Sequence, residues 1–396
     1  MKANSIAAKP VGLFLLLIIA FSILSPSIAH GQTPTQDWVD QQLKSLNIDD
    51  IQSYWETVVS QYHGFLPESQ HMTFLDFLKS DKQGLFKEWT LGLLNFVFHE
   101  LVVNGKLLGT LILLTVLSMI LQSIQNAFEH RTVSKVAYVI VYLVLIILTL
   151  NTFRVAIDYT TSAIQSMSHF LLALVPLIFA LMATSGGAAS VAFFHPIIIF
   201  LINTSGWLIS AVILPLLYMS ALLNIVSTLT EHYKVTQLAN LMRNIAVGGL
   251  AGFFAIFLGV MSVQGAATAV TDGVIVRTAK FVTGNFVPFV GRMFTDAADT
   301  VFSASVLVKN TVGIAGLFIL VAIVAFPALK VLALAIIYNI ASAILQPLGG
   351  GPIIESLGIM AKSMIFIFAA LCIVSLMFFL ALTIIIASGN LSLMVR

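Results

Sequence analysis

The chain has 396 residues, of which 59% are hydrophobic and only 9% are charged, and its formal net charge is +2. Soluble domains carry about 25% charged residues, so this composition excludes a soluble enzyme, a nucleic-acid-binding protein and a disordered chain. The single cysteine, Cys372, excludes an internal disulfide and a cysteine-rich metal site. What remains is an all-α fold, a polytopic α-helical membrane protein, because backbone groups in hydrocarbon must be satisfied within helices.

The first 29 residues are predicted to be a cleavable signal peptide. Two lysines precede an apolar stretch at residues 11–24, which is shorter than the ~20 residues of a spanning helix and suits a signal peptide. Pro26 then ends the helix, and small residues permit cleavage after Ala29. The alternative is an uncleaved first anchor helix, and in both cases the residues that follow are exported.

Residues 30–104 are predicted to form a small exported helical segment. They include ten acidic and four basic residues, which gives a net charge of −6. Ile51, Trp55, Val58 and Tyr62 recur at helical spacing, so the segment has an apolar stripe that must pack against another surface. Two interpretations stay open: a helical cap on the membrane domain, or a docking surface for a partner outside the membrane.

Residues 105–396 are predicted to be a multispan membrane domain with seven to nine helices. We expect nine spans, which would place the carboxyl terminus inside, and a turn near Gly206 separates two of them. If that run crosses only once, every later span reverses, and the basic residues of the loops do not decide between the two orientations. The nine apolar segments are 106–123, 136–152, 168–184, 190–203, 206–227, 245–263, 311–329, 331–346 and 364–388.

The sequence contains no motif for catalysis or nucleotide binding. It lacks a His-Glu-x-x-His metal helix, a Gly-x-Ser-x-Gly elbow and a Gly-x-x-x-x-Gly-Lys-Ser/Thr phosphate loop. We therefore expect a protein that is not an enzyme and that binds no cofactor, metal or nucleic acid. We expect the protein to be surrounded by membrane lipid.

A polar segment, residues 265–310, interrupts the membrane domain. Gly284, Pro288 and Gly291 permit a break in the backbone, and the residues that follow form an amphipathic helix. We expect a dip into the membrane that lines an aqueous path or contacts a partner; the alternative is an interfacial helix lying flat on the bilayer. The candidate path or partner-contact residues, one of them from a second Gly/Pro-rich turn, are Pro288, Gly291, Asp296, Asp299, Ser303, Lys309 and Gly349.

Three stretches of the chain carry distinctive motifs. They are residues 62–68 (YHGFLPE), residues 286–292 (FVPFVGR) with their continuation to Asn310, and residues 347–349 (PLG). In these motifs the chain resembles the stage III sporulation protein AE family of endospore-forming bacteria. The order of signal peptide, exported helical segment and multispan domain is also similar, so the likeness covers essentially the whole chain.

The resemblance implies a non-enzymatic membrane component of a secretion-like channel complex that links mother cell and forespore and supports forespore development. It implies a place in the mother-cell-derived outer forespore membrane. The implied partners are the other stage III sporulation proteins AA to AH and, indirectly, stage III sporulation protein Q of the forespore. Two alternatives from other classes are a self-sufficient small-solute transporter and a structural membrane scaffold without a conducting path.

Overall fold

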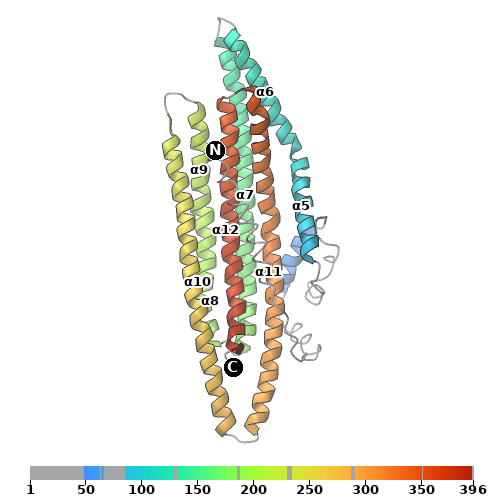
Figure 1. The fold of residues 1–396 in the computed structure, drawn as a ribbon, viewed down its shortest axis with the longest axis vertical. Coiled ribbons are helices and arrows are strands. Elements are labelled where there is room, and N and C mark those ends of the chain that lie inside the picture. The colour runs from blue at the N-terminus through green and yellow to red at the C-terminus, as the bar shows by residue number, and fades with distance from the viewer. Residues whose placement is uncertain are drawn as a thin grey trace.

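The computed structural model shows an elongated bundle of long α-helices (Figure 1). It describes residues 49–62, 64–66, 85–127, 132–184, 188–229, 234–286, 290–349 and 351–394. These residues contain no β-strand, so the predicted all-α fold is confirmed for this part of the chain. The predicted signal peptide, with its cleavage after Ala29, lies outside the described residues.

The long helical runs lie along the long axis (Figure 1). From α6 onward they alternate in direction, with α8 to α9 as one run, whereas α5 leads into α6 in the same direction. Helices α7, α11 and α12 form the centre, and α11 packs most extensively against α12. Helices α8, α9 and α10 lie on one side of this centre, and α5 and α6 lie on the other (Figure 1). The elements are α3 (Asp49–Tyr62), α5 (Leu85–Val103), α6 (Gly105–Ala127), α7 (Thr132–Thr184), α8 (Ala188–Leu208), the π-helix η2 (Ile209–Ile213), α9 (Leu214–Leu229), α10 (Thr236–Phe286), α11 (Val290–Leu345), the short 3-10 helix η3 (Gln346–Leu348) and α12 (Pro352–Met394).

Six helices of the described chain are long and apolar enough to cross a membrane, which is fewer than the seven to nine expected from the sequence. Three pairs of predicted spans are each one continuous helical run: α7 joins two, α8 to α9 joins two, and α11 joins two. The polar residues between the paired segments lower the hydropathy but leave backbone hydrogen bonding intact, so they do not end a helix. Six crossings by the described helices would place the start of α6 and the end of α12 on the same side, whereas nine spans would place the carboxyl terminus inside.

The predicted turn near Gly206 is instead helix. A Cβ on Gly206 would lie 3.0 Å from the hydroxyl oxygen of Ser168, so this glycine allows close packing between α8 and α7. The helix loosens a little later, in the π-helical turn η2, which ends just before Pro215. Proline has no backbone N–H and its ring crowds the preceding turn, and a wider π turn accommodates both effects.

The polar segment, residues 265–310, forms the last part of α10 and the first part of α11 in the described chain. Helix α10 continues through Gly284 to Phe286, and α11 is regular from Val290 onward, so the two helices form a long hairpin (Figure 1). The described part of this stretch belongs to helices that run along the bundle axis. Gly284 lies in the last turn of α10 and Gly291 in the first turn of α11, whereas Pro288 lies outside the described residues.

Candidate functional site

Helix α3, which lies in the segment predicted to be exported, is anchored on the bundle by an aromatic cluster. The Tyr62 ring stacks on Phe326 of α11, with centroids 3.8 Å apart and planes 10° apart. Phe96 of α5 meets both rings edge-on, at 6.0 Å from Tyr62 and 5.0 Å from Phe326. All three side chains are buried. We call Tyr62, Phe65, Phe96 and Phe326 the aromatic dock; it shows that the stripe predicted for α3 packs on the membrane domain.

The turn after α3 completes the dock. The backbone N–H groups of Phe65 and Leu66 both donate to the carbonyl of Tyr62, at 2.9 and 3.2 Å. This turn places the Phe65 ring edge-on against Phe96, with centroids 5.0 Å apart. A Cβ on Gly92 of α5 would overlap the carbonyl oxygen of Phe65, so only glycine permits this close approach. The motif at residues 62–68 therefore has a packing role in its described part.

Charged groups lie beside the aromatic dock. Lys330 of α11 pairs with Glu100 of α5, with 3.8 Å between Nζ and Oε1. The Lys330 ammonium also lies 5.1 Å from the ring centroid of Tyr159 on α7. The side chain of Asn104 donates to the other Glu100 carboxylate oxygen at 3.1 Å. Burial, then the charge of Glu100 and then Tyr159 raise the pKa of Tyr62 to about 12, so its stacked ring stays neutral at physiological pH.

A second polar feature lies where α11 packs on α12. Lys309 is fully buried, and its ammonium donates to the backbone carbonyl of Ile386 at 3.0 Å. Ser305, one turn earlier on α11, is also fully buried. Four residues later, a Cβ on Gly313 would come within 2.6 Å of the Ile386 side chain, so the two helices are close here. The arrangement can hold two helices together, and it offers no nucleophile with an adjacent base.

Three hydroxyl groups join α7, α9 and α12 toward the opposite end of the bundle. The Tyr142 hydroxyl lies 2.5 Å from Thr228 Oγ1 and 2.7 Å from Ser356 Oγ. Thr228 and Ser356 are 2.9 Å apart, and Ser356 also donates to the Pro352 carbonyl at 2.8 Å. Each hydroxyl is thus satisfied within protein, as hydrocarbon requires. Helix packing therefore accounts for the hydroxyl groups of the buried Tyr142 and Ser356 and of the half-buried Thr228.

The structure does not bring the candidate path residues together. Lys309 lies in the lower part of α11 (Figure 1). Gly349 follows the upper end of the same helix, and Lys309 is about 54 Å from that end at 1.5 Å per residue. Gly349 has φ of 145°, a conformation that favours glycine, so the backbone of the second Gly/Pro-rich turn explains the glycine at this position. Gly291 lies in α11. Pro288 and the side chains of Asp296, Asp299 and Ser303 lie outside the described residues.

Sequence reasoning missed the groups that lie beside the aromatic dock. Lys330 stands between two predicted spans, and Glu100 is one of the ten acidic residues of the segment at 30–104. A lone charge flanked by apolar runs is the signal that could have found Lys330, because it needs a nearby partner. Gly92 gave no signal, since its neighbour Phe65 is distant in sequence.

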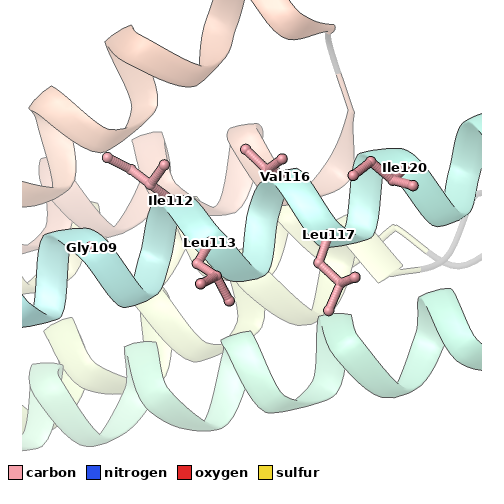
Figure 2. A pocket seen from close by; sticks show the side chains of 6 residues that line it. All are labelled: Gly109, Ile112, Leu113, Val116, Leu117 and Ile120. Atoms are coloured by element: carbon pink, nitrogen blue, oxygen red, sulfur yellow. The ribbon is translucent and has the colours of Figure 1, made fainter.

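A shallow apolar pocket of about 490 Å³ lies along α6. Figure 2 shows Ile112, Val116 and Ile120 on one side of the helix and Leu113 and Leu117 on the other, with Gly109 at the near end. No polar side chain lines it, so it can hold an apolar group but performs no chemistry. Among the residues that the structure describes, no three His, Cys, Asp or Glu side chains gather as a metal site needs.

Six apolar helices with a docked amphipathic segment define a polytopic α-helical membrane protein. The chain belongs to the stage III sporulation protein AE family, because the sequence profile described as Stage III sporulation protein AE matches residues 69–389. It is also similar to Stage III sporulation protein AE of Bacillus subtilis (strain 168). The two are 61% identical over 367 residues, which covers 93% of this chain and 92% of that protein. No solved structure matches the chain.

Proposed function

We propose that this chain is a non-enzymatic component of a sporulation channel complex in the membrane around the forespore, where it supports forespore development. The observation that carries the proposal is the 61% identity to a stage III sporulation protein AE across 93% of the chain. The described site residues are consistent with a part in a larger membrane assembly, since they hold helices together. The other stage III sporulation proteins AA to AH are the proposed direct partners, and stage III sporulation protein Q is the indirect one.

The exported segment supplies a surface for such partners. One face of α3 is buried against α7 and α11, and its outer face exposes Ser53, Glu56, Thr57 and Ser60. Because the aromatic dock fixes α3 to the bundle, a partner that binds the outer face would be held in register with the membrane helices. The inner face of α3 would then serve as the cap on the membrane domain, and its outer face would serve as the docking surface for a partner.

The proposal is tested by replacing the Bacillus subtilis relative with this chain. A Bacillus subtilis strain that lacks its stage III sporulation protein AE would receive this chain, and heat-resistant spores would be counted. We expect restored spore formation, and co-purification of the chain with other stage III A proteins from sporulating cells. Failure of both, with the chain present in membranes at normal level, would contradict the proposal.

The candidate path residues have a separate test in the same strain. Asp296→Lys with Asp299→Lys should reduce spore counts at least tenfold while the protein level stays unchanged, if the start of α11 lines a path or contacts a partner. Lys234→Gln, an exposed lysine at a distant turn, is the control. Normal sporulation of the double variant would assign these two residues no important role.

A transport assay separates the proposal from the transporter alternative. The purified chain would be reconstituted in liposomes without partners, and the flux of small solutes would be measured. We expect no flux above protein-free liposomes, because a component of a larger channel lacks the remaining walls. Specific, saturable flux by the chain alone would favour the self-sufficient transporter.

A further inference from the structure

The central helices are much longer than a bilayer is thick. Helix α7 has 53 residues and α11 has 56, so at 1.5 Å per residue they are about 80 and 84 Å long. The hydrocarbon core is ~30 Å thick and needs ~20 residues. Even the apolar window of α7, Val136–Thr184, has 49 residues. One bilayer can therefore cover less than half of each helix.

Charged side chains gather around the level of the middle of α7. Lys330 pairs with Glu100 and lies over Tyr159, which places α5, α7 and α11 at one level. Arg243 of α10 lies 5.5 Å from the ring centroid of Phe366 on α12. We call the group the mid-height belt, and it consists of Glu100, Lys106, Arg154, Asp158, Arg243, Lys330 and Lys362.

The two parts of the belt lie at similar heights. Tyr142 and Ser356 share a hydrogen bond, and their helices α7 and α12 run in the same direction (Figure 1). From that common level, Lys362 lies about 9 Å and Arg154 about 18 Å further along the axis. Both side chains are exposed, as are Lys106 and Asp158. The belt therefore faces the surroundings of the bundle and is not confined to its interior.

Apolar surface lies on both sides of the belt. On the side of the α11–α12 turn, Ile140 and Ile344 are 55% and 52% exposed. On the other side, Phe200 and Ile256 are 65% and 63% exposed. A bilayer centred on the belt would bury several exposed charges in hydrocarbon, which is unfavourable. A bilayer on one side of the belt places those charges at headgroup level, where long basic side chains are favoured.

We propose that the mid-height belt is a lipid-headgroup site: it lies at one bilayer surface and binds the phosphates of anionic lipids. Five of its seven residues are basic, which fits phosphate. The hydrocarbon then covers one apolar zone only. The other zone lies outside the bilayer, where its exposed apolar residues need protein contacts.

Cysteine accessibility tests the position of the belt. Asn151→Cys and Asn244→Cys probe exposed neutral positions at belt level, and Ile140→Cys and Ile256→Cys probe the two zones. Each is made in a Cys372→Ser background, placed in lipid nanodiscs and treated with a water-soluble maleimide, with detergent solution as the full-reaction control. We expect both belt cysteines to react and just one zone to be protected. Protection of a belt cysteine, of both zones or of neither would overturn the proposal.

Lipid binding tests the ligand. Native mass spectrometry would count phosphatidylglycerol and phosphatidylcholine molecules retained by the purified full chain. Arg154→Gln with Lys362→Gln should weaken phosphatidylglycerol retention about tenfold or more, because each basic group near an anionic surface contributes about fivefold. Phosphatidylcholine retention and the Lys234→Gln control should not change. Equal loss in the control, or no loss in the double variant, would refute the headgroup site.

Discussion

At the scale of single residues, Gly92 shows how the absence of a side chain allows the turn after α3 to pack on α5. Gly92→Ala would drive a methyl group into the Phe65 carbonyl, and backbone cannot move as a flexible side chain can. Overpacking of this kind costs about 1–3 kcal/mol, partly offset by the better helix propensity of alanine. We expect the thermal midpoint in detergent to fall.

Gly109→Ala is the matched control for Gly92→Ala. A Cβ at Gly109 of α6 would have nothing within 4 Å, so helix propensity alone should stabilise this variant by about 0.5–1 kcal/mol. The two substitutions are chemically identical and should shift the midpoint in opposite directions. A stabilising Gly92→Ala would show that the turn after α3 does not pack on α5 as described.

Lys309 is a residue whose charge is costly for stability. Lys309→Met keeps a long side chain and removes a buried ammonium, so the variant should be within about 1 kcal/mol of the parent or more stable. Thermal unfolding in detergent measures this. Normal stability with a loss of sporulation would mean that the charge serves function. A fall of several degrees in the midpoint would instead make the bond to Ile386 a structural requirement.

At the scale of elements, α3 depends on the aromatic dock. Tyr62→Ala removes a buried ring that contacts Phe96 and Phe326, which should weaken docking by about 3 kcal/mol. Hydrogen exchange of the α3 amides should then accelerate while the exchange of α11 and α12 stays slow. Tyr62→Phe, which keeps the stacked ring, is the control. Unchanged protection in Tyr62→Ala would contradict the dock.

At the scale of the whole molecule, the direction of the helices fixes which ends share a side. Ser134 lies in the first turn of α7, and Ser303 lies in the lower part of α11, toward the opposite end of the bundle (Figure 1). Single cysteines at the two positions, in a Cys372→Ser background, should react with an impermeant thiol reagent from opposite sides of sealed vesicles. Reaction from the same side would contradict the arrangement of six crossing helices.

Part of the functional architecture could be predicted from residue patterns alone. The helical spacing of Trp55 and Tyr62 predicted a packed stripe on α3, and the structure confirms it, since both side chains are buried against the bundle. The partners of that stripe could not be predicted, because Phe326 lies more than 250 residues away. Lys330 and Glu100 were missed for the same reason: each needs a partner that only the packing of α5 on α11 supplies.

The sequence by itself determined the solvent of this protein and its secondary structure, because scarce charge and long apolar runs leave helices in hydrocarbon as the stable solution. The tertiary structure decided into how many separate helices these apolar runs are divided. Polar residues such as Arg154 and Lys330 interrupt hydropathy, but helix continuity depends on backbone hydrogen bonds and on packing against neighbours, which hydropathy does not measure. Tertiary structure also decided which glycines are needed, since close approach at Gly92 or Gly206 is a property of two helices together.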